Sequence, residues 1–277
     1  MLSKIKGFRF RQRKKEWLSE IIKDHYDLNN EKFFSFGAGN QRSKFDYWKY
    51  VDMPTSGYQD EGIDYFYDLE DLKEFPDEIN DATVIFSSFL LEHVSIEATR
   101  NFIQQSCSAL KSGGIWHAKV HDYDYSLRLM RNGVIPIKFP FGIREYRSKV
   151  KEAMNNRSNV AIRAGQVIIG GEVYDAHDAF LAHNAACFDR SKKSDLDGIG
   201  DEEIWQFLNN NIEVDKRKPH QHNADYVSAD IIKKMCLEAG FSEVYSVAPY
   251  QSISPALWED VLNPIHDGFY FGVEAIK

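Results

Sequence analysis

Two glycines follow a short apolar run early in the chain. Residues 32–36 are mostly apolar and lead into Gly37-Ala38-Gly39-Asn40. Glycine lets the backbone approach a ligand closely, and the N-terminus of a helix offers amide groups that no helical carbonyl accepts. A strand, a glycine turn and a helix therefore predict a cradle for a nucleotide-type cofactor. The two glycines alone do not select which cofactor.

The neighbouring residues argue against a dinucleotide. The dinucleotide fingerprint has a third glycine, and Arg42 stands in its place. Asp52 also comes earlier than the acidic residue that follows that fingerprint by about 20 residues. NAD is therefore a second choice.

Several histidines are candidates for a general base, because histidine titrates near neutral pH. These are His93, His121, His177, His183, His220 and His222. We favour His121 and His177, and His121 follows a predicted strand at the carboxyl edge where open α/β sheets bind ligands. His93, at the opening of a predicted helix, better fits a structural or cofactor-side role. His220 and His222 with Asp225 have donor atoms that suit a metal, but a polar loop explains them equally and no metal ligand is assigned.

Strands and helices alternate over the first 125 residues or so. Apolar spacing predicts a helix over residues 16–26 and strands over 32–36, 47–51, 82–86 and 115–120. A further helix over residues 98–110 is predicted to end at the turn Lys111-Ser112-Gly113-Gly114. This alternation predicts a doubly wound, mostly parallel sheet.

The pattern loosens from residue 125 to about residue 223 and then returns. A helix is predicted over residues 229–239, and strands over 241–247 and 269–276. The irregular segment is therefore expected to be an insertion that interrupts one sheet, not a linker between two independent domains.

Composition narrows the class of protein. The formal net charge of −8 disfavours a nucleic-acid partner, and no apolar run is long enough to cross a bilayer. The basic start, Met1 to Lys15, lacks the apolar stretch of a secretory signal. The cysteines, Cys107, Cys187 and Cys236, are far apart, so they suggest neither a disulfide framework nor zinc. We expect a cytoplasmic protein.

Six ordered motifs resemble class I S-adenosylmethionine-dependent methyltransferases. The motifs are FFSFGAGN, KYVDM, DLEDLKEFPD, ATVIFSSFLLEHV, SALKSGGIWHAKVHDYD and LEAGFSEVYSV. They are most similar to the branch of predicted methyltransferases that carries LEH and LKPGG motifs. The resemblance covers residues 32–124 and 228–277 and departs at Ala38, Ser112 and His121.

The resemblance implies a Rossmann-like, doubly wound, seven-stranded sheet with an inserted cap. It divides the chain into an N-terminal helical extension (1–30), a cofactor-binding core (31–124), an insertion for the substrate (125–225) and a C-terminal part of the core (226–277).

The resemblance also implies a set of cofactor-binding residues. The glycine turn would lie beneath the methionine part of S-adenosylmethionine, Asp52 would hold the ribose, Asp68 and Leu69 would border the adenine, and the end of the strand at Ser87 would line the methyl pocket. Ser87 is equally explained as a strand-end cap. The full set is Phe36, Gly37, Ala38, Gly39, Asp52, Met53, Asp68, Leu69, Ser87, Ser88, Phe89 and His93.

The expected reaction transfers a methyl group to a hydroxyl or amine of a small polar acceptor and leaves S-adenosylhomocysteine. A nucleotide-linked sugar or a surface-glycan precursor, as in polysaccharide biosynthesis, is one such acceptor, and Arg144 and Arg147 would suit its phosphate. The candidate bases are His121, His177, which ends a family-like GGEVYDAH run, and His93. Two alternatives stay open: a catalytically silent methyltransferase-like binding protein, and an NAD-dependent or nucleotide-sugar enzyme.

Overall fold

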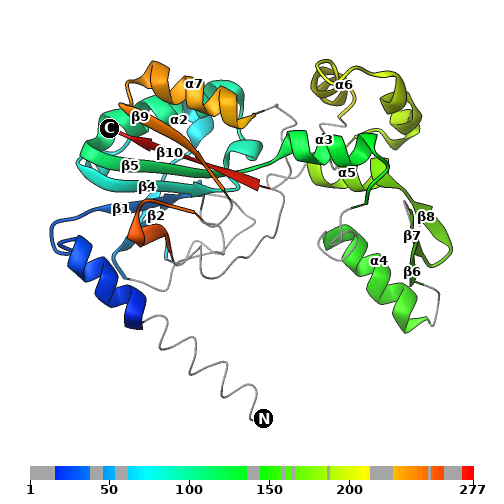
Figure 1. The fold of residues 1–277 in the computed structure, drawn as a ribbon, viewed down its shortest axis with the longest axis horizontal. Helices are drawn as coiled ribbons and strands as arrows, with labels where there is room; N and C mark the ends of the chain where they lie inside the picture. The colour runs from blue at the N-terminus through cyan, green and yellow to red at the C-terminus, as the bar shows by residue number, and fades with distance from the viewer. Residues whose placement is uncertain are drawn as a thin grey trace, which may run out of the picture. The chain divides into compact units, whose positions relative to one another are not determined.

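The structure, a computed structural model, divides into two compact units. It describes residues 16–37, 46–53, 62–135, 144–156, 160–163, 166–185, 188–212, 227–248, 251–258 and 270–277. One unit comprises Met1–His121 and Ala229–Lys277, and the other comprises Asp122–Ser228 (Figure 1). The predicted finer boundaries at residues 30, 124 and 225 stay a prediction.

The first unit is built on a seven-stranded sheet with the order β3-β2-β1-β4-β5-β10-β9. The parallel part runs from β3 to β5, and β10 is antiparallel to both β5 and β9 (Figure 1). This confirms the predicted doubly wound, Rossmann-like sheet. The strands are β1 (Phe33–Phe36), β2 (Trp48–Asp52), β3 (Tyr65–Phe66), β4 (Ala82–Ser88), β5 (Leu110–His121), β9 (Glu243–Val247) and β10 (Tyr270–Ile276).

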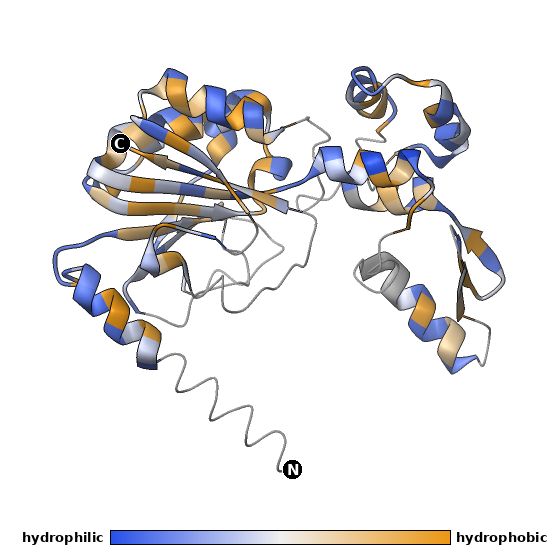
Figure 2. Ribbon diagram, viewed as in Figure 1, coloured by the Kyte–Doolittle hydropathy of each residue, from blue (hydrophilic) through white to orange (hydrophobic). Residues whose placement is uncertain are grey.

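Apolar side chains cover both faces of the central strands, as a parallel sheet requires. On one face, Leu18 and Ile22 of the helix over residues 16–25 pack with Phe33, Trp48 and residues of η6 (Pro255–Leu257). On the other face, Phe102 of α2 (Ile96–Ala109) contacts Trp116, with 6.1 Å between ring centroids. Helix α7 (Ala229–Ala239) packs beside α2. Figure 2 shows hydrophobic residues along the central strands and alternating hydrophobic and hydrophilic residues on the helices.

The prediction that a glycine turn follows α2 is wrong. The helix ends at Ala109, and β5 begins directly at Leu110. Gly113 and Gly114 lie inside β5, where the pairing register with β4 shifts. Gly113 has a φ of +74°, and its N–H donates to the Lys277 carbonyl at 3.0 Å. The two glycines therefore lie at an irregularity in the strand and do not end the helix. The left-handed φ of Gly113 makes this irregularity possible.

The second unit has its own apolar cores and a small antiparallel sheet of order β6-β7-β8. Tyr123, Phe180 and Trp205 belong to the helical core, and Val150 and Val167 to the core beside the sheet. Short elements joined by polar residues conceal this regularity in the sequence. The elements are α3 (Tyr123–Arg131), α4 (Arg144–Asn155), β6 (Val160–Arg163), β7 (Gln166–Ile169), β8 (Glu172–Tyr174), α5 (Ala176–Asn184), η4 (Arg190–Gly198) and α6 (Ile204–Asn210).

Among the residues that the structure describes, no helix combines the length and the apolar character needed to span a bilayer.

A buried polar pair joins β5 to β10 within the sheet. Nδ1 of His117 and Oε1 of Glu274 are 2.8 Å apart, and the two side chains are 2% and 0% exposed. The other carboxylate oxygen accepts the Ile253 N–H at 3.0 Å. Burial alone would raise the pKa of Glu274, but hydrogen bonds from His117, Ser252 and Ile253 hold it below its usual value. The carboxylate is therefore kept ionised inside the sheet by its partners.

We predict that His117→Leu destabilises the first unit by about 3 kcal/mol, because the buried carboxylate of Glu274 then loses its hydrogen bond to His117. Urea unfolding followed by tryptophan fluorescence measures the loss. The double variant His117→Leu/Glu274→Met is expected to recover most of it, since it also removes the carboxylate that His117→Leu leaves buried. Because the folded pKa of Glu274 is depressed, the stabilisation is present above the unfolded value and is lost as the pH falls through the folded value. Equal stability of His117→Leu and the wild type would contradict this account.

Candidate active site

The strand order reverses at β1, which pairs with β2 on one side and β4 on the other. Open α/β sheets bind ligands at the carboxyl ends of the strands flanking such a reversal. Phe36 pairs in register with both Val51 and Ser87. The next residues along the three strands are Gly37, Asp52 and Ser88, so these three predicted site residues are neighbours across the sheet edge.

Gly37 begins the predicted glycine turn and has a conformation that requires glycine. Its φ is +65°, and a Cβ atom built on it would lie 2.7 Å from Cδ1 of Leu90. Its N–H donates to the Val51 carbonyl at 2.9 Å. The preceding Phe36 ring is buried against Phe102, with 5.0 Å between centroids. Phe36 therefore contributes packing and a backbone position, while Ala38 and Gly39 lie outside the described residues.

Asp52 ends β2 with a half-buried carboxylate. Its Oδ1 accepts the N–H of the exposed Met53 at 2.9 Å. Its carbonyl accepts the Tyr67 N–H at 2.9 Å, which brings Asp68 to the same edge. Asp68 is the N-cap of the 3₁₀ turn η1 (Leu69–Asp71), and Leu69 is buried. The structure thus brings the predicted ribose residue next to the predicted adenine loop.

The end of β4 contains an unsatisfied hydroxyl and a strained residue. Ser87 is fully buried, and its Oγ has no hydrogen-bond partner, so it does not cap the strand. Ser88 is half-buried. Phe89 has a φ of +54° and donates its N–H to the Lys119 carbonyl at 2.9 Å. A left-handed phenylalanine costs free energy, and such strain concentrates at functional sites.

The predicted helix start at the LEH motif is wrong. Leu91–His93 form a separate 3₁₀ turn, η3. Helix α2 begins at Ile96, and Ser95 is its N-cap. The hydroxyl of Ser95 accepts the Ala98 N–H, and this bond fixes Ser95 as the residue that caps the helix. His93 is half-buried in the 3₁₀ turn, and its cofactor-side role stays a prediction.

Glu92 is a functional candidate that the sequence analysis missed. It is 1% exposed, and neither carboxylate oxygen has a hydrogen-bond partner. Burial raises its pKa to about 8. The signal in the sequence is a single carboxylate inside the apolar run FLLEHV. A buried carboxyl group with a strongly raised pKa is typical of functional sites.

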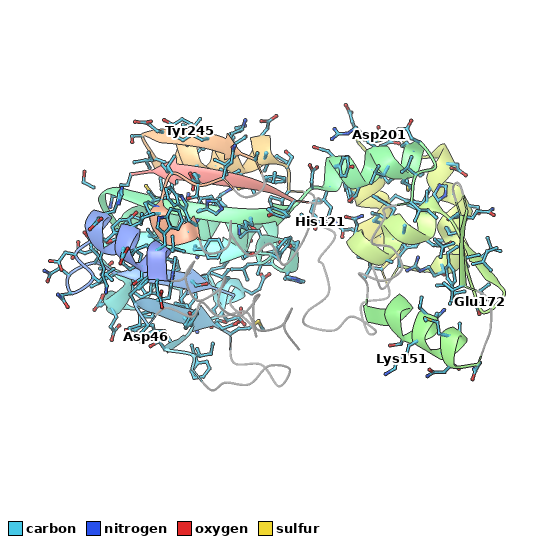
Figure 3. All side chains as sticks on the ribbon, turned by 60° about the horizontal axis from the view of Figure 1, so that its bottom comes forward. Asp46, His121, Lys151, Glu172, Asp201 and Tyr245 are labelled. Carbon is cyan, nitrogen blue, oxygen red and sulfur yellow. The ribbon has the colours of Figure 1, made fainter. Side chains whose placement is uncertain are left out.

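Three basic residues alternate on β5: His117, Lys119 and His121. All three are buried. The ammonium of Lys119 lies 5.4 Å from the Phe86 ring centroid and 6.0 Å from that of Tyr270. His121 is the last residue of β5 (Figure 3), and it pairs in register with Tyr270. The predicted base thus lies at the carboxyl end of its strand, and the alternation in WHAKVH was the missed signal for Lys119.

His177 belongs to the second unit, in the first turn of α5. Its Nε2 lies 2.9 Å from Oδ1 of Asp197, and its Nδ1 lies 3.8 Å from Oδ1 of Asp175. Asp175 caps the same helix and also pairs with Lys193. Both ring nitrogens therefore face carboxylates, which is an arrangement that fixes the ring.

Several remaining candidates fall outside the described residues. These are His220, His222 and Asp225, together with the side chains of Arg144, Arg147 and His183. Within the described ranges, His, Cys, Asp and Glu side chains form no group of three that could hold a metal ion.

Comparison with known proteins gives weak structural matches only. No family model matches the sequence, and no curated protein matches it. An S-adenosylmethionine-dependent methyltransferase from Mesorhizobium loti is 13% identical, with a TM-score of 0.38 over 95% of this chain and 96% of that one. One from Archaeoglobus fulgidus is 12% identical, with a TM-score of 0.40 over 96% and 94%. An O-methyltransferase family protein from Burkholderia thailandensis is 11% identical, with a TM-score of 0.39 over 97% and 56%. TM-scores and identities this low do not establish a shared function.

We predict that Glu92→Gln changes how stability depends on pH. An unfolded glutamic acid ionises near pH 4.3, whereas folded Glu92 keeps its proton to about pH 8. Between these values the folded chain binds more protons, so the free energy of unfolding falls as the pH rises. The wild type should lose about 1.4 kcal/mol per pH unit relative to Glu92→Gln over this window.

Urea unfolding from about pH 5 to about pH 8 tests this difference. Glu97→Gln, which removes an exposed carboxylate from α2, is the control and should follow the wild type. Parallel pH curves for Glu92→Gln and the wild type would show that Glu92 is ionised in the folded protein.

Proposed function

We propose that this chain is a class I S-adenosylmethionine-dependent methyltransferase that methylates a hydroxyl or amine of a small polar acceptor. The observation that carries the proposal is the alignment of Gly37, Asp52 and Ser88 at the reversal of strand order. These residues come from three of the motifs that resemble the family. Their meeting at one sheet edge is what a shared cofactor site requires.

The strands that follow β5 in the sheet support a methyltransferase over a dinucleotide enzyme. A dinucleotide-binding sheet continues from its fifth strand to a parallel sixth strand, in the order 3-2-1-4-5-6. Here β5 instead pairs with the antiparallel β10, and β9 lies outside it. This arrangement agrees with the class I methyltransferase fold and disfavours the NAD alternative.

The described residues fit S-adenosylmethionine. Gly37 would lie beneath the methionine part, where a side chain cannot be accommodated. Asp52 has a partly exposed carboxylate, and an ionised carboxylate accepts hydrogen bonds from a ribose diol. Leu69 and the Asp68 turn would border the adenine. Their hydrogen-bonded connection to Asp52 through Tyr67 keeps these two parts of the site adjacent.

The chemistry leaves little for the protein to supply beyond alignment. When bound, the sulfonium supplies an activated methyl group for an in-line displacement. A hydroxyl acceptor also needs a group that takes its proton, and we assign this role to His121. Its place at the end of β5 supports the assignment, whereas His177 has both ring nitrogens turned toward carboxylates. The sugar or glycan nature of the acceptor rests on the sequence alone.

Calorimetric titration with S-adenosylhomocysteine tests the proposal. We expect micromolar binding by the wild type, weakened at least about tenfold, or 1.4 kcal/mol, in Asp52→Ala. Asp230→Asn is the matched control, because it removes a carboxylate that is 89% exposed on α7. Absence of binding by the wild type, or binding of NAD in its place, would refute the proposal.

A further inference from the structure

Helix α2 has half of a capping box within its own sequence. In a capping box, the N-cap hydroxyl accepts the backbone N–H of the third helical residue, whose Glu or Gln side chain accepts the N–H of the N-cap residue. Ser95 makes the first bond, accepting the Ala98 N–H at 3.1 Å. The third helical residue is Ala98, which is fully buried. A buried alanine therefore stands where a capping box has the Glu or Gln that accepts the N–H of the N-cap residue.

Glu70 of η1 supplies the missing acceptor from a different part of the chain. Its Oε1 accepts the Ser95 N–H at 2.6 Å, and its Oε2 accepts the Ser95 hydroxyl at 2.8 Å. A carboxylate is also favourable at the positive end of a helix. Both bonds are charge-assisted and hold the carboxylate in one orientation. We call this contact the Glu70–Ser95 clamp.

The clamp acts on the loop that carries Asp68 and Leu69. Oδ1 of Asp68 accepts the Glu70 N–H at 3.0 Å, so the two residues belong to one hydrogen-bonded turn. The Tyr67 N–H is bonded to the Asp52 carbonyl. These hydrogen bonds therefore connect the end of β2, through the loop of η1, to Ser95, the N-cap of α2.

The same loop is attached to α2 a second time. Oε1 of Gln105 accepts the Phe75 N–H at 2.8 Å, and Nε2 of Gln105 donates to the Lys73 carbonyl. The Phe75 ring lies 5.0 Å from the Phe36 ring, at the end of β1. The segment is thus attached to α2 and its cap at Glu70 and again at Lys73 and Phe75, and Phe75 contacts the residue that precedes Gly37.

We infer that Glu70 is a positioning residue of the cofactor site, which sets the distance between the Asp68 turn and the ends of β1 and β2. This inference rests on the proposed function. Glu70 acts through Asp68 and Ser95 and is not required to touch the ligand. Releasing its carboxylate would let the adenine side of the site move while the sheet edge stays in place.

Four variants separate positioning from simple helix capping. Glu70→Gln removes the charge from the clamp. Ser95→Asp keeps a good N-cap residue but places a second carboxylate against Glu70. Ser95→Thr keeps both the cap and the hydroxyl donor and should behave like the wild type. Glu97→Gln removes an exposed carboxylate from the first turn of the same helix and leaves the clamp intact.

The variants are compared by calorimetric titration with S-adenosylhomocysteine, by urea unfolding, and by hydrogen exchange of residues 67–76 without ligand. Glu70→Gln and Ser95→Asp should each bind about fivefold more weakly, or about 1 kcal/mol, and should exchange faster in this segment. Ser95→Thr and Glu97→Gln should match the wild type, and the unfolding midpoint of Ser95→Asp should stay close to it.

Unchanged affinity and unchanged exchange in Glu70→Gln would overturn the inference. A loss of affinity that follows the unfolding midpoint across all four variants would reduce Glu70 to a helix cap and would overturn it as well. A wild type that does not bind S-adenosylhomocysteine would defeat the proposed function and the cofactor role of Glu70 together. The exchange data would then still decide whether Glu70 holds the loop.

Discussion

The position of β1 between β2 and β4 is the constraint on which the site depends. This strand has four residues, all of them buried, and it is bonded on both sides. Its register fixes which residues of the neighbouring strands meet at the carboxyl edge, because a slip by one residue would turn every side chain to the opposite face. The left-handed Gly37 then lets the chain leave the strand against Leu90. Asp52 and Ser88, both predicted site residues, are neighbours only because this strand holds their own strands in line.

The same unit handles two buried carboxyl groups in opposite ways. Glu274 lies between two strands and has a histidine and a backbone amide as partners, so it stays ionised despite its burial. Glu92 lies in a 3₁₀ turn without a partner and keeps its proton to about pH 8. Partners therefore decide the charge of a carboxyl group where the dielectric is low. The neutral acid lies in the turn after β4, within the segment that leads from the site into α2.

Stability and site geometry are linked at the start of α2. The helix needs an acceptor for the N–H of Ser95, and the buried Ala98 cannot provide one. Glu70 provides it, and its own loop is thereby fixed next to the end of β2. One carboxylate satisfies a helix end and orders a loop at the same time. The aromatic contact of Phe75 with Phe36 extends this ordering to the end of β1.

The sequence by itself determined where most elements of the first unit lie, because the spacing of apolar residues reports the burial of each element locally. The helix over residues 229–239 was predicted to the residue, and the glycine turn and Asp52 indicated the sheet edge at which we propose the site. Only the tertiary structure decided the insertion of β10 between β5 and β9, the two-residue strand β3, and the separation of η3 from α2. It also decided the polar partnerships of His117 with Glu274, 157 residues apart, and of Glu70 with Ser95, 25 residues apart. Local periodicity cannot reveal such pairs, because each polar side chain finds its partner through strand order and helix packing.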